Sequence, residues 1–312
     1  MRRILAALLC GALFLGLSAC GGAPGAVSGG SQSGSQSQAA QSGDGSQGDS
    51  SQEGYRDFTR PEIGSPVVLD PPYDFDPEEM LPRDFGGCFG EDYPVETETY
   101  KLAEGTDAEN EVFVIRGREE GPSVYVVAGV HGDEMAGWMT GNLLKKATIR
   151  AGTLYVLSPA NPWGAAAEPR SRYVTGEEDL NRSFPGSPDG NMAQRTAHSI
   201  YQDIARAEPV FVFDLHEARY NEESRDFLGS SLIFTSLDGM DQLCMELLLA
   251  TESGELCSER YNFFGPGPEG SVNHTVTTGL GIPTITIETY RGYPLERRIG
   301  DQLAIVEYVL GY

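Results

Sequence analysis

The sequence has little positive charge and few histidines or cysteines. It holds 22 Lys and Arg residues against 46 Asp and Glu, which gives a formal net charge of −24 at pH 7. This balance argues against a nucleic-acid partner, because binding to phosphates needs a basic surface, and it also argues against adsorption to anionic lipid through a polybasic patch. Aromatic residues make up 9% of the 312 residues, so the chain is not expected to be wholly disordered.

Long apolar runs are missing after the first twenty residues, where no segment approaches the roughly eighteen apolar residues of a membrane-spanning helix. At the start, two arginines precede an apolar stretch from Ile4 to Leu17, and the small residues that follow end in Cys20. This order is typical of a secretory signal and resembles a bacterial lipoprotein signal. The resemblance implies that residues 1–19 are removed and that Cys20 carries lipid; the alternative is an ordinary signal with an accidental cysteine.

The segment after Cys20 is poor in apolar residues. Residues 21–54 contain 10 Gly, 9 Ser and 6 Gln, which predicts a flexible tether that reaches roughly 30–35 Å. We therefore expect residues 20–54 to tie a folded domain at 55–312, with an extended lead-in at 55–96, to the bacterial cell membrane. The protein is then expected to act outside the cytoplasm.

Three cysteines remain in the expected domain, namely Cys88, Cys244 and Cys257. An odd number allows at most one internal disulfide. Cys244 lies within an apolar helical pattern, where a buried free thiol and a disulfide both remain open.

From residue 97 onward, short β-branched runs alternate with helical periods. Strands are predicted at Thr97–Leu102, Glu111–Ile115, Ser123–Ala128, Thr153–Leu157, Val210–Asp214, Ser231–Thr235 and Thr284–Ile287. Helices are predicted at Glu134–Lys146, Met192–Ala207, Met240–Thr251, Val272–Gly279 and Leu295–Leu310. We therefore expect a single α/β domain with a mostly parallel, mixed central sheet flanked by helices.

Three of the predicted strands run directly into polar residues. His131 and Glu134 follow the first of them, Asp214 and His216 come at the end of the second, and Glu288 follows the third. In an open α/β sheet, ligands bind beyond the carboxyl ends of the strands. These side chains are therefore expected to meet at one edge of the sheet.

Two histidines and a carboxylate in this arrangement predict a zinc site. His131 and Glu134 straddle a strand-to-helix turn, and His216 arrives 82 residues after Glu134, again at a strand end. Catalytic zinc sites use three protein ligands, of which His₂Glu is one set, and keep a fourth position for water. Asp214 could orient an imidazole. The alternative is that each histidine is a core residue with satisfied hydrogen bonds.

A second polar group lies in a Pro- and Gly-rich segment between these strands. Arg170, Arg172 and Arg182 form a local positive region in an acidic chain. Guanidinium groups make bidentate hydrogen bonds with carboxylates, and Asn181 adds donors beside them. The alternative is surface salt bridging to the acidic residues nearby. These are Glu177, Glu178 and Asp179.

Taken together and in order, these motifs resemble the succinylglutamate desuccinylase/aspartoacylase family, which is related to the zinc carboxypeptidases of the carboxypeptidase A type. The resemblance covers roughly residues 111–288. The motifs that carry it are His131–Glu134 (H-G-D-E), Ala160–Pro162 (A-N-P), Arg172–Tyr173, Asp179–Phe184 (D-L-N-R-S-F), Asp214–His216 (D-L-H) and the strand ending in Glu288. It implies a carboxypeptidase-like fold.

The resemblance also implies roles for individual residues. His131, Glu134 and His216 match the ligands of one Zn²⁺ per chain, and Glu288 matches the general base. Arg172 matches the residue that polarises the scissile carbonyl, with Arg170 as a substitute. Asn181 and Arg182 match the clamp for the substrate carboxylate. Asp214 and Asp179 are expected in the second coordination sphere.

The expected function is zinc-dependent hydrolysis of an amide C–N bond next to a carboxylate, as in an N-acyl-amino-acid deacylase. The alternative is an extracytoplasmic carboxypeptidase that acts on peptides or peptidoglycan stem peptides. A third possibility is a tethered binding lipoprotein without turnover. Glu288 separates the two enzymes from the binding lipoprotein, because a binding protein has no need of a general base.

Overall fold

The computed structural model describes residues 62–80, 93–176, 178–219, 228–237, 239–254 and 256–311. The expected signal at 1–19, the tether at 20–54 with Cys20, and Cys88 lie outside these residues and stay predictions. Cys244 and Cys257 are both free thiols, so the pattern around Cys244 marks a packed helix rather than a disulfide.

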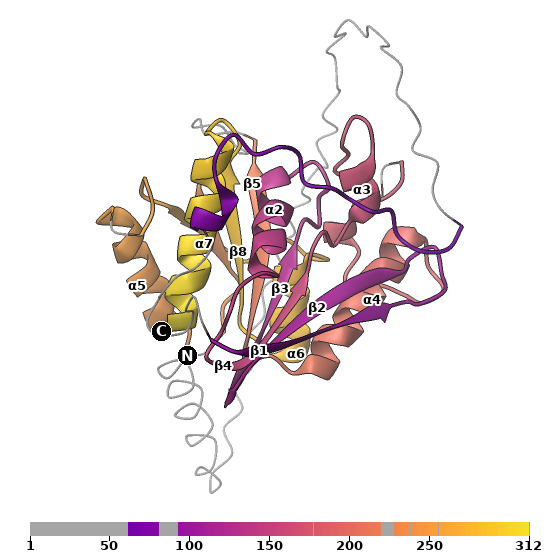
Figure 1. Ribbon diagram of the computed structural model, residues 1–312, viewed down its shortest axis with the longest axis horizontal. Helices are drawn as coiled ribbons and strands as arrows, with labels where there is room; N and C mark the ends of the chain where they lie inside the picture. Colours follow the sequence, from indigo (N-terminus) through magenta and orange to yellow (C-terminus); the bar gives the residue numbers. More distant parts are fainter. Residues whose placement is uncertain are drawn as a thin grey trace, which may run out of the picture.

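An eight-stranded mixed sheet runs through the described residues in the order β1-β2-β4-β3-β5-β8-β6-β7 (Figure 1). The strands are β1 (Val95–Leu102), β2 (Asn110–Gly117), β3 (Glu119–Ala128), β4 (Ala151–Leu157), β5 (Phe211–Ala218), β6 (Ser231–Phe234), β7 (Asn262–Phe264) and β8 (Thr284–Tyr290). The four central strands β4, β3, β5 and β8 are mutually parallel, whereas β2 and β6 pair with them in the antiparallel sense. The expected mostly parallel, mixed sheet is confirmed.

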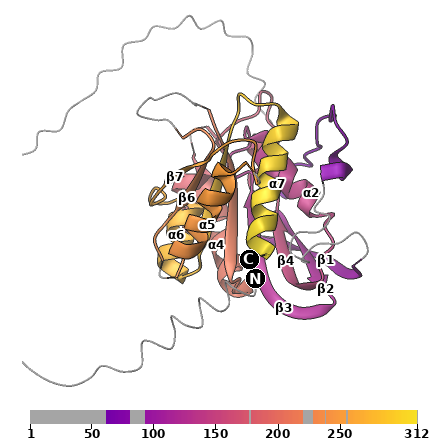
Figure 2. The same ribbon diagram turned by 90° about the vertical axis from the view of Figure 1, so that its left-hand side faces the viewer.

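Helices cover both faces of this sheet. They are α2 (Met135–Leu144), α3 (Pro162–Ala166), α4 (Met192–Ala207), α5 (Asp241–Glu252), α6 (Val272–Leu280) and α7 (Leu295–Gly311), with 3₁₀ turns η2 (Pro77–Met80) and η3 (Leu180–Arg182). Helices α2, α5 and α7 cover one face of the sheet, and α4 and α6 cover the other (Figures 1 and 2). An apolar cluster joins each set of helices to its face. The expected single α/β domain is confirmed. Within the described ranges, no helix combines the length and apolarity needed to cross a bilayer.

The alternation of side chains along the central strands decides which face carries the polar residues. On β5, Phe211, Phe213 and Leu215 pack in the cluster with α2 and α7, whereas Val212 packs in the cluster with α4 and α6. Because successive strand residues point to opposite faces, His216 lies on the α4/α6 face, as does Asp214. On β8 the same argument puts Glu288 there, because Ile285 and Ile287 occupy the other cluster.

Helix α4 shows how the sequence specifies this second layer. It begins at a capping box, in which Asn191 accepts a hydrogen bond from the backbone N of Gln194 and the Gln194 side chain accepts one from the backbone N of Asn191. Buried residues then recur at helical spacing on one face. They are Ala193, Ala197, Ile200 and Ile204. This face closes the core beneath η3 and so fixes the segment that carries Asn181 and Arg182.

The ends of two central strands differ from the sequence prediction. Strand β5 runs to Ala218 rather than to Asp214, and β8 runs to Tyr290 rather than to Ile287. The reason is that the parallel ladder continues through the polar residues, with His216 paired with Glu288. His216 and Glu288 therefore lie within the last residues of their strands and not in the loops that follow. The short elements β7 and α3 were not predicted.

Candidate active site

The turn between β3 and α2 places His131 and Glu134, and its glycines explain the local sequence. Gly129 has a φ of +73°, a conformation that favours glycine, and a Cβ there would meet Cβ of Trp138 at 2.6 Å. A Cβ on Gly132 would lie 2.1 Å from the backbone of Gly164 and Ala165. The chain therefore turns tightly against the segment at residues 164–165, and Glu134 stands directly before the first residue of α2.

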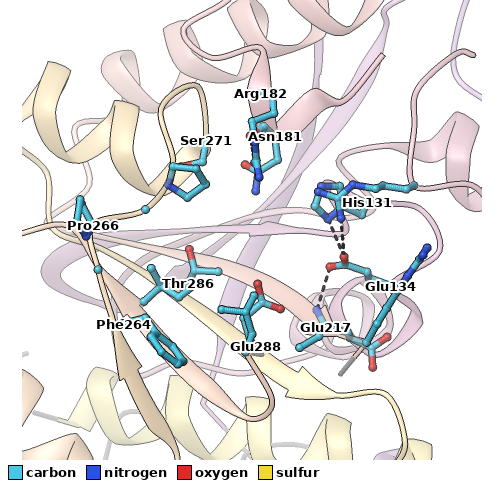
Figure 3. A pocket seen from close by; sticks show the side chains of 18 of the residues that line it. His131, Glu134, Asn181, Arg182, Glu217, Phe264, Pro266, Ser271, Thr286 and Glu288 are labelled. Carbon is cyan, nitrogen blue, oxygen red and sulfur yellow. Dashed lines mark hydrogen bonds and ion pairs between the residues drawn. The ribbon is translucent and has the colours of Figure 1, made fainter. Parts of the chain in front are cut away.

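Three predicted metal ligands converge at this turn. Nδ1 of His131 lies 2.7 Å from Oε1 of Glu134 (Figure 3). Nδ1 of His216 lies 2.8 Å from Oε2 of the same carboxylate. The possible ligand atoms of the three residues lie within 4.8 Å of one another, and all three side chains are buried. The sequence expectation that β3 and β5 bring these residues together is confirmed.

The other ring nitrogens face carboxylates. Nε2 of His131 lies 3.3 Å from Oδ1 of Asp179, and Nε2 of His216 lies 2.9 Å from Oδ1 of Asp214. A histidine that donates its outer N–H to a carboxylate keeps the opposite nitrogen as a free, more basic ligand atom. Both Nδ1 atoms are turned toward Glu134, so the donor set and its supporting carboxylates fit a zinc ion.

The charges of this group are mutually dependent. Burial alone would raise the pKa of Glu134, but the charges of His131 and His216 outweigh it and hold the pKa well below its usual range. Burial would likewise lower the pKa of His216, yet Asp214 and Glu134 raise it well above its usual value. The site is built for a positive charge next to the Glu134 carboxylate.

Glu288 lies beside this group without a partner of its own. It pairs with His216 in the β5–β8 ladder and lines the same cavity, and its exposed fraction is 8%. Among the described residues, no group makes a hydrogen bond or ion pair with its carboxylate. Burial raises the pKa of Glu288 to about 7. A carboxylate that titrates near neutrality suits proton transfer at that pH.

Glu217, the other acid at this edge, is already engaged. Its Oε2 accepts a hydrogen bond of 2.9 Å from the backbone N of Ala136, and Oε1 pairs with Arg298 on α7. Glu217 thus ties β5 to α2 and α7, whereas Glu288 has a free carboxylate.

Arg172 and Arg170 lie in different places, one at the candidate site and one outside it. Arg172 donates from Nε and Nη2 to Oδ2 of Asp179, and its Nη1 lies 3.7 Å from Oε1 of Glu134. Arg170 instead lies over the ring of Trp138, at 5.8 Å from the centroid. Of these two arginines, Arg172 is therefore the one that reaches the candidate ligands.

Asn181 and Arg182 lie on η3, and Nδ2 of Asn181 lies 3.4 Å from Nε2 of His216. The Asn181 side chain is fixed, because its Oδ1 accepts a hydrogen bond of 3.0 Å from the backbone N of Val272. Arg182 is exposed and donates to the carbonyl oxygen of Asn181 at 2.7 Å. Within the described part of the chain, no carboxylate pairs with Arg182, which leaves its guanidinium available to an anionic ligand.

Most of the predicted site residues line one cavity of about 390 Å³, namely His131, Glu134, Arg172, Asn181, Arg182 and Glu288. His216, Asp214, Asp179 and Arg170 are not among its lining residues. Figure 3 shows His131 and Glu134 on one side of it, Arg182 and Asn181 across the top, and Phe264, Pro266 and Thr286 on the side away from His131. Residues 264–268 supply the part of this last wall that does not come from β8.

One cavity residue, Arg291, was missed by the sequence prediction. Its Nη1 lies 2.9 Å from Oδ2 of Asp133, and its Nη2 lies 3.3 Å from Oε1 of Glu134. Arg219 binds the same Asp133 oxygen from the other side at 2.9 Å. The signal that could have found it is the spacing, since Arg291 comes three residues after Glu288 at the end of the same strand.

Comparison with known proteins adds to this geometry. Residues 120–306, more than half of the chain, match the model of the succinylglutamate desuccinylase/aspartoacylase catalytic domain. The chain is also 33% identical over 120 residues to the N-alpha-acetyl-L-2,4-diaminobutyric acid deacetylase of Halomonas elongata. That alignment covers 37% of this chain and 34% of the deacetylase, so the chain spans about a third of the relative's length.

Solved structures share the fold. An aspartoacylase family protein from Mesorhizobium loti has a TM-score of 0.51 and 21% identity, with 70% of this chain and 68% of that chain covered. A metallo-carboxypeptidase from Burkholderia cenocepacia has a TM-score of 0.50 and 13% identity, with 69% and 64% covered. The expected carboxypeptidase-like fold is confirmed.

Proposed function

The chain belongs to the succinylglutamate desuccinylase/aspartoacylase family, and we propose that it is a zinc-dependent hydrolase of small N-acyl amino acids. The bond cleaved is the amide C–N bond next to the carboxylate of the amino acid. The observation that carries this proposal is the convergence of His131, Glu134 and His216 beside Glu288. Glu288 and Arg182 line one cavity, and among the described residues neither pairs with an oppositely charged side chain.

His131, Glu134 and His216 would hold the metal ion. When bound, zinc supplies Lewis-acid activation of water and of the scissile carbonyl. Asp179 and Asp214 support this arrangement through the outer nitrogens of the two histidines, at 3.3 and 2.9 Å.

Glu288 is the proposed proton-transfer group. Its carboxylate lines the cavity and has no hydrogen bond to any described residue, so it can accept a proton from the attacking water and return it to the leaving amine nitrogen. With its pKa near 7, both directions of transfer are accessible at neutral pH. Arg172, held by Asp179, provides positive charge where the carbonyl oxygen becomes negative.

Arg182 is the proposed anchor for the substrate carboxylate. Its guanidinium group offers paired N–H donors, and none of the described carboxylates occupies them. Anchoring at this point orients the amide toward the two histidines. Arg182→Ala should therefore raise KM strongly for carboxylate-bearing substrates, while proton transfer by Glu288, and with it kcat, changes little.

The size of the cavity favours a deacylase over the alternative carboxypeptidase. About 390 Å³ lies at the small end of the range for ligand sites and suits an acylated amino acid better than several residues of a peptide. The curated relative from Halomonas elongata is named as a deacetylase of an acetylated amino acid, which supports the same choice.

We also propose that the protein works outside the cytoplasm, attached to the bacterial membrane through lipid on Cys20. The support is the sequence alone: a basic start, an apolar stretch, the small residues up to Cys20 and the Gly/Ser/Gln segment after it.

A panel assay tests the proposed reaction. The chain is incubated with zinc and with N-acyl amino acids, dipeptides and muropeptides, and release of free amine is measured with and without a chelator. We expect chelator-sensitive release from N-acyl amino acids. Release from dipeptides or muropeptides alone would favour the carboxypeptidase, and binding of these ligands without release would favour a binding lipoprotein.

A further inference from the structure

We infer that the cavity wall beside Arg182 forms a pocket for an uncharged, apolar amino-acid side chain, so that the preferred substrates are N-acyl derivatives of amino acids such as leucine and phenylalanine. This inference rests on the proposed function and specifies its substrate class.

The pocket lies along the sheet, next to Glu288. Thr286 is two residues before Glu288 on β8, about 7 Å along the same face, and Ile233 pairs with Thr286 from β6. Phe264 and Pro266 close the side away from His131 (Figure 3). The charged lining residues other than Glu288 and Arg182 gather around Glu134 instead. They are His131, Arg172, Glu217, Arg219 and Arg291.

Among the described residues, the hydroxyls of Thr286 and Ser271 in this pocket each make one hydrogen bond. The hydroxyl of Thr286 donates to Oδ2 of Asp214 at 3.0 Å. The hydroxyl of Ser271 accepts a hydrogen bond of 3.1 Å from the backbone N of His274 at the start of α6. A charged side chain entering here would lose its hydration without a matching partner, whereas an apolar one would gain by leaving water.

The outer wall is held in place before any ligand binds. The backbone N of Gly267 donates to Oγ1 of Thr235 at 3.1 Å, and that hydroxyl donates to Oδ1 of Asn273 at 2.6 Å. The Asn273 amide in turn donates to the carbonyl of Ile233 at 2.9 Å. Because a Cβ on Gly265 would lie 2.0 Å from the carbonyl oxygen of Phe234, the segment also packs directly on β6. The pocket is therefore preformed.

The pocket and the carboxylate anchor share a wall, which decides which part of the substrate enters. The backbone N of Phe184 donates to the carbonyl of Gly270 at 3.0 Å, and a Cβ on Gly270 would lie 2.6 Å from the carbonyl oxygen of Arg182. A carboxylate bound at Arg182 thus has the pocket next to it. The group that carries this carboxylate is the amino acid, so its side chain fills the pocket and the acyl group lies toward His131.

The test compares side chains on a constant acyl group. N-acetyl derivatives of glycine, leucine, phenylalanine, aspartate and ornithine are assayed with the zinc-loaded chain for kcat/KM, and binding of the corresponding free amino acids is measured by calorimetry. We expect kcat/KM for N-acetyl-leucine and N-acetyl-phenylalanine to exceed that for N-acetyl-glycine by about 10- to 100-fold. The kcat/KM values for the aspartate and ornithine derivatives should fall below that for the leucine derivative.

Phe264→Lys places a cation at the rim of the pocket, at a residue with 37% exposure whose replacement the fold should tolerate. The variant should raise the ratio of kcat/KM for N-acetyl-aspartate to that for N-acetyl-leucine by at least about tenfold, and the ratio of the affinities for the free amino acids should change in the same direction. Leu249→Lys on α5, at 57% exposure and outside the cavity lining, is the matched control and should leave the ratio unchanged.

Wild-type preference for aspartate or ornithine would overturn the inference, as would an unchanged ratio in Phe264→Lys. The two proposals fail separately. If no N-acetyl amino acid is hydrolysed but free leucine binds at least tenfold tighter than aspartate, the pocket stands and the proposed reaction falls. If hydrolysis occurs with charged side chains preferred, the reaction stands and the pocket falls.

Discussion

Nε2 of His216 lies 2.9 Å from Oδ1 of Asp214, a carboxylate with an exposed fraction of 0%. The two residues come from the same strand and face the same side of the sheet, so the backbone of β5 fixes their relation. Asp214 is further held by the hydroxyl of Thr286 on the neighbouring strand. This pair sets which nitrogen of His216 is free to bind a metal ion.

Asp214→Asn should weaken zinc binding. The amide keeps the shape and an acceptor oxygen but removes the charge that makes the His216 ring more basic, and loss of such a partner typically costs about 10- to 100-fold in metal affinity. Competition with a zinc-chelating dye measures it. Asp107→Asn, whose carboxylate pairs with Arg195 away from the cavity, is the control. Unchanged zinc affinity in Asp214→Asn would show that the pair is dispensable.

Glu288→Gln should retain zinc and lose turnover. The amide keeps the shape of the side chain but cannot accept the proton of the attacking water, and general acid–base assistance is worth about 10²–10⁴-fold in rate. The loss should lie in kcat with little change in KM, because Arg182 is untouched. Steady-state kinetics together with metal analysis measure both.

Glu217→Gln is the control for Glu288→Gln, because it changes the other glutamate at this edge of the sheet. Its carboxylate is bound by Ala136 and Arg298, so this change should act through stability rather than proton transfer. If kcat is normal in Glu288→Gln and lost in Glu217→Gln, Glu217 is the proton-transfer group and Glu288 is not. Loss of zinc from Glu288→Gln would instead make Glu288 a ligand.

The sequence predicted the central part of the fold because burial determines it. Residues 124–128 of β3 and 211–213 of β5 are apolar on both faces, and α4 has a strong helical period with a recognisable cap. Elements β7 and α3 have three and five residues, too few for a periodic pattern, and were missed. The ends of β5 and β8 were misplaced because polar side chains interrupt the apolar pattern while the backbone ladder continues.

In the candidate site too, the residues at strand ends could be predicted from the sequence, whereas those that depend on turns and packing could not. His131, Glu134 and His216 could be paired because strand ends in a parallel sheet share an edge. Arg291 was not assigned, because apart from its spacing of three residues after Glu288 its place beside Glu134 depends on the turn after β8. The apolar pocket was likewise hidden, since Phe264 reaches the cavity only through the packing of residues 265–267 on β6 and Asn273.

Glu307 provides a prediction about stability and pH. Burial on α7 raises its pKa from 4.5 to about 7, and it has no hydrogen-bond partner among the described residues. The folded chain therefore holds a proton that the unfolded chain releases, so stability falls as pH rises from about 4.5 to about 7 and stays reduced above that. Glu307→Gln should remove this loss.

At pH 8 Glu307→Gln should be more stable than wild type by about 1–2 kcal/mol, allowing for solvent screening of a shift of this size. At pH 4.5 the two should be nearly equal. Denaturant unfolding at both values measures the difference, with Glu296→Gln, exposed on the same helix, as the control. An equal gain at both pH values would contradict the assignment to ionisation.

Cys20→Ala tests the proposed anchor, which lies outside the described residues. The wild-type protein should be recovered from membranes with a lipid-modified Cys20 at its N-terminus, and the variant should carry no lipid. Mass spectrometry of the mature N-terminus reads this directly. An unmodified terminus well downstream of Cys20 in the wild type would refute the anchor, and Cys257→Ala provides a control for cysteine loss in general.

The zinc content of four histidine variants tests the metal centre most directly, because the chain has four His in total. His131→Ala and His216→Ala each remove one of three ligands and should lose stoichiometric zinc. His198→Ala and His274→Ala, on α4 and α6, should keep about one zinc per chain, as in the wild type. Full zinc occupancy in both His131→Ala and His216→Ala would contradict the site.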